Sequence, residues 1–150
     1  MHDHQHQTTG GDDSTGSKAC VLGMLRNAGL RPTRQRVALA TLLYSKGNRH
    51  ITAEMLYEEA IRARVPVSLA TIYNALHQFT DAGMLRELAI DGTRTYFDTN
   101  TSDHQHFFIE SDGEMIDIPS PGLRVSGIPE VPAGKRVARI DVVVRLADDD

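Results

Sequence analysis

Residues 68–83, SLATIYNALHQFTDAG, have the pattern of an amphipathic helix with one buried stripe and one polar face. Ser68 is a favourable N-cap residue, and Gly83 suits the left-handed conformation that often ends a helix. The large apolar residues recur at spacings of three, four and three, which places them on one side of a helix: Leu69, Ile72, Leu76 and Phe79. The stretch therefore predicts a helix that packs one face against a core.

The opposite face of this predicted helix is short, polar and uncharged, and it comprises Ala70, Thr71, Tyr73, Asn74, His77 and Gln78. Such side chains suit the base edges of a DNA major groove. An ordinary solvated helix face explains the same pattern equally well. A basic cluster earlier in the chain favours nucleic acid, because arginines beside a helix N-terminus can hold phosphate: Arg31, Arg34 and Arg36.

Three further helices are predicted upstream, each with an N-cap residue. Ser17 caps the first, which Gly29 ends; Thr33 caps the second, over 34–45; Thr52 caps the third, over 53–63. Downstream, Asp91-Gly92 between the expected strands at 84–90 and 93–99 is typical of a hairpin turn. Four helices and a two-stranded ribbon in this order predict a winged helix-turn-helix. Winged helices also bind protein and RNA, so the fold alone does not establish function.

The C-terminal third has a different composition and predicts strands. Residues 104–110 and 114–118 read as two strands around a turn at 111–113, and 136–146 as a last strand, whereas prolines and glycines over 119–134 disfavour a long helix. Three short strands bury little apolar surface by themselves, and we therefore expect the C-terminal third to form a homodimer interface. The predicted class is α+β: a disordered tail (1–16), a winged helix-turn-helix domain (17–98), a hinge (99–103) and a small α/β or mostly β dimerisation and sensing domain (104–147).

Charge is distributed unevenly along the 150 residues. The net charge is -4, yet residues 18–97 carry 11 basic and 6 acidic side chains, whereas residues 98–150 carry 5 and 11. This asymmetry is typical of a DNA-binding part joined to a part with another role. The sequence has no apolar run long enough for a membrane helix and no secretory signal, and its single cysteine, Cys20, favours a reducing compartment. We therefore expect a cytoplasmic protein with no membrane partner.

His104 and His106 are separated by one residue on a predicted strand. Because side chains alternate along a strand, both imidazoles lie on one face. Imidazole binds Fe, Mn and Zn well, so the pair is a candidate metal site. A surface pair of histidines with no ligand is the simpler alternative on spacing alone.

Four stretches together resemble the ferric uptake regulator family: AGLRPTRQRVALATLL, ITAEMLYEEA, SLATIYNALHQFTDAGML and HQHFFIESDGEMIDI. Asn74 after Tyr73, and the end RIDVVVRL, resemble most the iron response regulator branch. The resemblance implies a homodimer that binds double-stranded operator DNA. It implies DNA contacts by the fourth helix, the wing and the start of the second helix, and the residues expected there are Arg31, Arg36, Ser68, Thr71, Tyr73, Asn74 and Arg94. The position of Asn74 is usually arginine in the family, which implies a different operator.

The resemblance also implies a regulatory metal site with histidine and carboxylate ligands: His50, Asp98, His104, His106 and Asp117. The aspartates stand where many relatives have glutamates, as in peroxide-sensing repressors. In the iron response branch the implied signal is haem, with His104 and His106 as axial ligands. Cys20 is followed by Val21, so the Cys-Pro haem motif is absent. Ile109 and Asp112 replace the usual C-x-x-C pair, so no cysteine-bound structural zinc is expected.

Several functions remain open at this level. The leading hypothesis is an iron-responsive transcriptional regulator controlled by haem, and the second is a Mn-, Fe- or Zn-dependent or peroxide-sensing repressor. A non-haem iron enzyme using His104 and His106 is disfavoured, because no phosphate loop or nucleophile beside a base is evident, so we expect no enzyme. A winged-helix module that binds protein is the fourth alternative.

Overall fold

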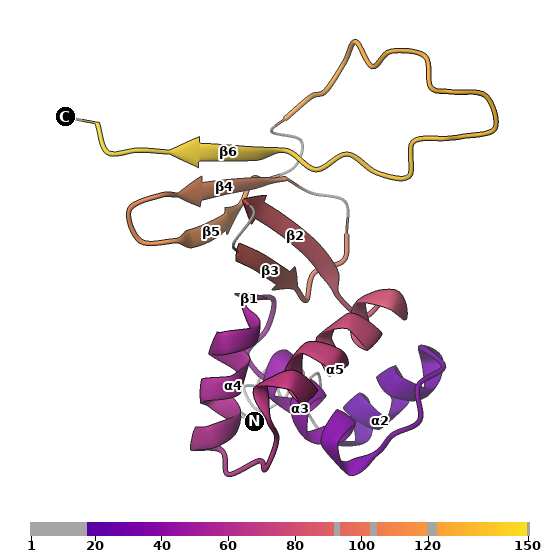
Figure 1. Ribbon diagram of the computed structural model, residues 1–150, viewed down its shortest axis with the longest axis vertical. Coiled ribbons are helices and arrows are strands. Elements are labelled where there is room, and N and C mark those ends of the chain that lie inside the picture. The colour runs from indigo at the N-terminus through magenta and orange to yellow at the C-terminus, as the bar shows by residue number, and fades with distance from the viewer. Residues whose placement is uncertain (1–17, 92–93, 103–104, 120–122, 150) are drawn as a thin grey trace, which may run out of the picture. The chain divides into compact units, whose positions relative to one another are not determined.

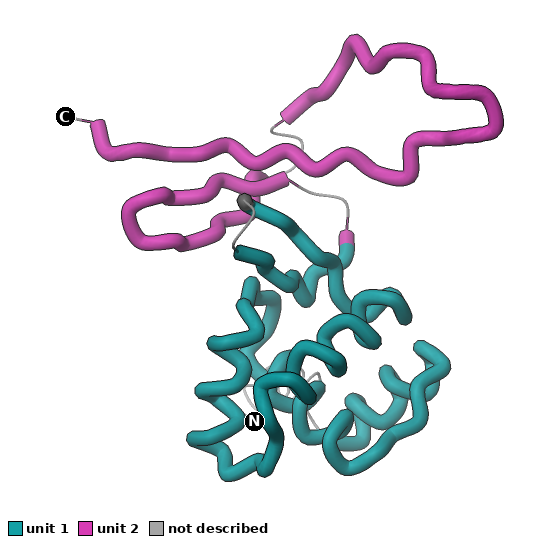
Figure 2. The backbone as a smooth tube through the Cα atoms, in the orientation of Figure 1, with its two compact units in different colours: residues 1–101 teal, residues 102–150 magenta. Residues whose placement is uncertain are grey.

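The computed structural model describes residues 18–91, 94–102, 105–119 and 123–149, and it divides into two compact units. Unit 1 is Met1–Thr101 and unit 2 is Ser102–Asp150, drawn in different colours in Figure 2. Unit 1 contains helices and a small sheet, and the described part of unit 2 contains strands and no helix. The α+β class is confirmed, and the mostly β form of the second domain is the one found.

The described part of unit 1 contains four helices, shown in Figure 1: α2 (Lys18–Asn27), α3 (Arg34–Tyr44), α4 (Ala53–Arg62) and α5 (Leu69–Asp81). The predicted N-caps of the last three are confirmed, because the side chains of Thr33, Thr52 and Ser68 each accept a hydrogen bond from a backbone N–H three residues on. Gly29 and Gly83 both have positive φ at helix ends, as expected. Ser17 lies outside the described residues.

One hydrophobic core joins the four helices of unit 1. The stripe predicted for α5 is buried at Ile72, Leu76 and Phe79, each fully inaccessible, while Leu69 is only partly buried. Fully buried members of the same core from other elements include Leu25, Leu39, Leu43, Leu56 and Phe97. The polar face of α5 therefore points away from the core, as an amphipathic helix requires.

The sheet of unit 1 has three strands, where the sequence predicted a two-stranded ribbon. β2 (Arg86–Asp91) and β3 (Arg94–Asp98) form the antiparallel hairpin, and the two-residue strand β1 (His50–Ile51) pairs with the other edge of β3. β1 was missed because two residues are too short for a periodic signal. The turn assignment at Asp91-Gly92 was also wrong, because Asp91 is the last residue of β2 and pairs with Arg94.

Unit 2 contains a three-stranded sheet in the order β5-β4-β6. β4 (His106–Ile109) pairs antiparallel with β5 (Glu114–Asp117) and parallel with β6 (Val143–Leu146). The last strand is therefore shorter than predicted, and residues 136–142 lie before it. Gln105 explains part of this difference. Its side chain donates to the carbonyl of Ile140 and accepts from the backbone N–H of Val142, which replaces strand pairing there.

No described helix is long and apolar enough to cross a membrane. The expected tail 1–16, His104 and Gly92 fall outside the described residues. Within the predicted hinge 99–103, Thr99 is buried and its backbone N–H donates to the carbonyl of Arg49 at 3.1 Å. The first residue of that segment is thus bonded to unit 1.

Candidate metal centre and nucleic-acid interface

Among the described residues of unit 1, His50 and Asp98 form a histidine–aspartate pair that the register of two strands brings together. The two residues are direct partners across β1 and β3, and His50 Nε2 lies 3.3 Å from Asp98 Oδ2. The other oxygen of Asp98 accepts a hydrogen bond from the backbone N–H of Asn100 at 2.9 Å. That bond orients the carboxylate, and the Asp98 side chain is almost fully buried.

Unit 2 holds a second pair of the same kind, His106 with Asp117. These residues are direct partners across β4 and β5, and His106 Nε2 lies 3.3 Å from Asp117 Oδ1. The His106 side chain is 1% exposed and that of Asp117 is 37% exposed. His106 is thus one of the few buried polar residues in the described chain, and its ring nitrogen faces a carboxylate that solvent can reach.

Both pairs fit the chemistry of a divalent ion. Imidazole nitrogen and carboxylate oxygen suit Fe, Mn and Zn, and such ligands lie about 2.0–2.2 Å from the ion. Two ligands at that distance, about 90–110° apart at the ion, are separated by about 3.0–3.5 Å. The 3.3 Å separation in each pair falls in this interval. Without an ion, each contact is an ion pair only when the histidine is protonated.

The five predicted ligands have therefore been placed as two pairs and one residue outside the described chain, which is His104. On spacing alone, His104 and His106 were expected to act together. His104 is not described, so that expectation stays a prediction, and the hairpin register places Asp117 opposite His106. The partner of His50 is Asp98 for the same reason. Sequence separation hides both pairings.

The polar face of α5 carries the candidate nucleic-acid contacts, and it is accessible. Tyr73 and Asn74 are exposed, and Ser68 and Thr71 lie at the helix N-terminus, with 2.9 Å between their hydroxyl oxygens. Between this face and the start of α3 lies a depression of about 390 Å³, whose lining includes Arg31, Thr33, Arg36, Thr71, Asn74 and Gln78. An exposed polar helix face beside arginines can bind phosphate and base edges together.

Arg36 has a more specific position than the sequence indicated. Its guanidinium donates twice to the side-chain oxygen of Gln78, at 3.3 and 2.9 Å, and once to the carbonyl of Arg31 at 3.0 Å. Arg36 thus links the start of α3 to α5 by hydrogen bonds. Arg31, Arg34 and Arg94 are exposed, so these side chains present their charges to solvent.

Glu54 is a neighbour of Tyr73 that sequence reasoning did not find. The Tyr73 hydroxyl donates to Glu54 Oε2 at 2.6 Å, from α5 to the first turn of α4. This hydrogen bond, with smaller contributions from desolvation and the Glu54 charge, raises the pKa of Tyr73 above its ordinary value. The hydroxyl proton is therefore held within the protein, and the ring remains exposed. The 19-residue separation gives no local sequence signal for this pair.

Comparisons with known proteins identify the family of the chain. The family model described as "Ferric uptake regulator family" matches residues 27–134. The chain is 39% identical over 103 residues to the peroxide-responsive repressor PerR of Staphylococcus epidermidis, covering 68% of this chain and 67% of that protein. It is 37% identical over 102 residues to PerR of Staphylococcus aureus strain Mu50, covering 68% of each.

Solved structures show the same likeness. The ferric uptake regulator of Pseudomonas aeruginosa with manganese superposes with a TM-score of 0.65 at 26% identity, covering 87% of this chain and 98% of that one. That of Vibrio cholerae gives a TM-score of 0.67 at 23% identity, covering 85% and 98%, which supports the fold. By the matched family model and these relatives, the chain belongs to the ferric uptake regulator family of metal-responsive transcription regulators.

Proposed function

We propose that this protein is a metal-responsive transcriptional repressor that binds double-stranded operator DNA as a homodimer. The single observation that carries the proposal is the presence of one histidine–aspartate pair in each unit, each with a 3.3 Å nitrogen–oxygen separation. With His104, these residues form the proposed ligand set for Fe, Mn or Zn: His50, Asp98, His104, His106 and Asp117. A bound ion would supply a positive centre for neutral imidazoles and carboxylates.

The ligand pairs support a mechanism in which metal controls domain arrangement. His50 and Asp98 belong to the DNA-binding unit, and His106 and Asp117 belong to the other unit. If both pairs bind one ion, the two units become less free to move relative to each other. In a dimer, that restriction narrows the range of spacings between the two recognition helices. Operator half-sites have a defined spacing, so metal and DNA would favour the same arrangement.

DNA recognition is proposed for the exposed face of α5. Tyr73 presents its ring and Asn74 its amide, which suit a thymine methyl and an adenine edge respectively. Ser68 and Thr71 lie at the N-terminal end of the helix. Arg31 and Arg94 are proposed to contact phosphates, with Arg36 in support, which gives salt-dependent affinity.

Dimerisation is proposed for one face of the sheet in unit 2. Phe107 is the register partner of both Ile116 and Val144, so these three side chains share a face. Ile116 is 41% exposed, and Ile109 pairs with Leu146 on the same face. A second copy would bury this apolar surface, which one sheet of short strands leaves open.

The controlling signal is proposed to be a metal ion, with peroxide sensing through bound iron as the second candidate. The relatives at 37–39% identity are peroxide-responsive repressors, and this favours peroxide sensing through bound iron as the second candidate. Haem control was expected from the iron response regulator resemblance, and it rests on that resemblance alone. The burial of His106 against Asp117 favours a small ion over a porphyrin, which needs an open space above the ligand nitrogen.

One gel-shift series tests the proposal. Duplexes enriched by the full chain from a random pool serve as probe, with chelator-treated protein and with Mn²⁺, Zn²⁺, Fe²⁺ or haem added. We expect binding to require a divalent ion and to be unaffected by haem, and Fe²⁺-loaded protein to lose binding after peroxide if the second candidate is right. Equal binding by chelator-treated protein, or release by haem alone, would overturn metal control.

A further inference from the structure

We infer that Arg49 and Glu59 are a positioning pair that couples the sensing strand β1 to the DNA-reading helices. The inference rests on the proposed function, because it assigns these two residues a part in carrying metal binding to α5. Neither residue belongs to the proposed ligands or DNA contacts. Both lie in unit 1.

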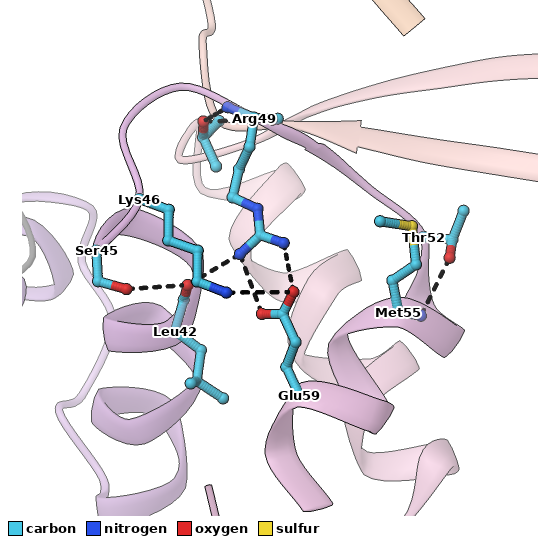
Figure 3. Close-up of polar contacts among 8 residues, drawn as sticks. Leu42, Ser45, Lys46, Arg49, Thr52, Met55 and Glu59 are labelled. Atoms are coloured by element: carbon cyan, nitrogen blue, oxygen red, sulfur yellow. Dashed lines mark hydrogen bonds and ion pairs between the residues drawn. The ribbon is translucent and has the colours of Figure 1, made fainter. Parts of the chain in front are cut away.

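The Arg49 guanidinium bridges two helices, as Figure 3 shows. It binds both carboxylate oxygens of Glu59 on α4, with Nη1 at 3.0 Å from Oε1 and Nη2 against Oε2. Nη1 also donates to the carbonyl of Leu42 near the end of α3, at 3.3 Å. Lys46 adds a weaker ion pair, with Nζ 3.9 Å from Glu59 Oε2. Arg49 and Glu59 side chains are only 14% and 10% exposed.

The backbone of Arg49 is fixed beside the ligand pair. Its N–H donates to the Thr99 hydroxyl at 2.9 Å, and its carbonyl accepts from the Thr99 N–H at 3.1 Å. Arg49 directly precedes His50, and Thr99 directly follows Asp98. Successive side chains of an extended strand point to opposite sides, so Arg49 reaches the helices while His50 faces Asp98. A change in the position of His50 therefore acts on α3 and α4 through the neighbouring residue.

The other end of α4 contacts the recognition helix. Glu54, five residues before Glu59 on the same helix, accepts the hydrogen bond from Tyr73 of α5. Five residues of helix span about 7–8 Å, and a hydrogen-bonded helix of that length is stiff. Hydrogen bonds therefore connect Arg49, which directly precedes β1, to Glu59 on α4, and Glu54 on the same helix to Tyr73 on α5.

A purely stabilising role is the alternative, and general energetics do not favour it. A buried ion pair offsets much of its attraction by the loss of hydration, so it often adds little stability relative to well-packed apolar side chains, although removal of one partner alone is costly. It does impose geometry, because a carboxylate can accept a two-pronged guanidinium in only a few orientations. The forked pair with a third contact to Leu42 suits the precise placement of His50.

Glu59→Gln tests the pair, with Glu58→Gln as matched control, because Glu58 is an exposed neighbour on α4 with the same charge. In the full chain, we measure the dissociation constant for Mn²⁺ by chelator competition, and the Mn²⁺-induced gain in affinity for enriched duplexes. We expect Glu59→Gln to weaken Mn²⁺ binding about tenfold, the low end of the loss caused by removing a direct contact to a ligand, because Glu59 acts on His50 through Arg49. The gain in DNA affinity should also shrink, while Glu58→Gln should match wild type.

Two further variants separate positioning from folding. Val21→Ala in the core of α2 lowers stability away from the pair, and it should leave the Mn²⁺ dissociation constant unchanged in folded protein. Glu59→Asp keeps the charge and should restore part of the affinity. Wild-type Mn²⁺ affinity and DNA gain in Glu59→Gln, or losses in Val21→Ala as large as those in Glu59→Gln, would overturn the inference. If wild type itself shows no Mn²⁺ effect on DNA binding, the proposed function fails instead.

Discussion

The N-cap of α5 offers the sharpest test of how local structure supports DNA recognition. Ser68 Oγ accepts a hydrogen bond from the backbone N–H of Thr71 at 3.1 Å and lies 2.9 Å from the Thr71 hydroxyl. Ser68→Ala removes the acceptor and leaves that N–H to water. Ser68→Gly also removes it but lets the backbone and water adapt, so the two substitutions should differ.

The expected magnitude follows from this one bond. Loss of a serine N-cap to alanine costs about 1 kcal/mol, within about 0.5–2, whereas glycine costs only a few tenths. For a domain of roughly 60–100 residues, 1 kcal/mol lowers the melting temperature by about 4–8 °C. If DNA binding must re-form the loosened first turn of α5, about 1 kcal/mol corresponds to about fivefold weaker affinity.

Thr52→Ala is the matched control, because Thr52 caps α4 through the same kind of bond, from the backbone N–H of Met55 at 3.1 Å. Urea unfolding measures the free energy of unfolding of each variant, and fluorescence anisotropy with enriched duplexes measures affinity below the melting range. We expect both alanine variants to lose similar stability. Ser68→Ala should lose more DNA affinity than Thr52→Ala, because only Ser68 caps the helix that is proposed to read DNA.

Two results would refute this reasoning. If Ser68→Ala and Ser68→Gly both unfold with the wild-type free energy, the hydrogen bond to Thr71 does not stabilise α5. If Ser68→Ala loses stability but no more DNA affinity than Thr52→Ala, the N-terminal turn of α5 does not contact DNA. The first result would refute the capping role of Ser68, and the second would remove Ser68 from the proposed recognition surface.

Four other expectations follow from named contacts. Tyr44→Phe should lower the free energy of unfolding by about 1–3 kcal/mol in urea titrations, because the buried hydroxyl donates to the carbonyl of Met84 and its removal leaves that acceptor unpaired; a loss below about 0.5 kcal/mol would contradict this account. Burial alone would raise the pKa of Glu59, but the hydrogen bonds and positive charge of Arg49 have the larger combined effect and lower this pKa below 4.5. A carboxyl group with a lowered pKa adds stability above pH 4.5, and this stability is lost as the pH falls through the folded-state pKa. Wild type should therefore lose more free energy of unfolding between pH 7 and pH 3 than Glu59→Gln does. Equal losses in the two proteins would refute this role of Glu59. Tyr73→Ala should weaken binding to enriched duplexes about tenfold or more, while Tyr73→Phe should stay within about threefold, because the hydroxyl already donates within the protein; equal losses would assign the hydroxyl to DNA. His106→Ala should behave like chelator-treated wild type in gel shifts with Mn²⁺, and normal Mn²⁺ dependence would exclude His106 as a ligand.

The local features of unit 1 were predictable because their signals lie within a few residues of each other. The caps Thr33, Thr52 and Ser68 and the buried stripe of α5 were all confirmed. The apolar stripe of a helix and the hydrogen bonds of its N-cap both involve residues three or four apart. Both features can therefore be recognised in a short window of sequence. Residue spacing alone predicted only His104 and His106 as candidate ligands. The resemblance to the family added His50, Asp98 and Asp117.

The sequence by itself determined the helices, the hairpin and the family, whereas the tertiary structure decided which polar groups meet. His50 meets Asp98 across 48 residues because a two-residue strand pairs with β3. Arg49 meets Glu59, and Tyr73 meets Glu54, because packing of the shared core sets the positions of α4 and α5. Strand register and helix packing depend on the whole core, so no window of neighbouring residues contains them.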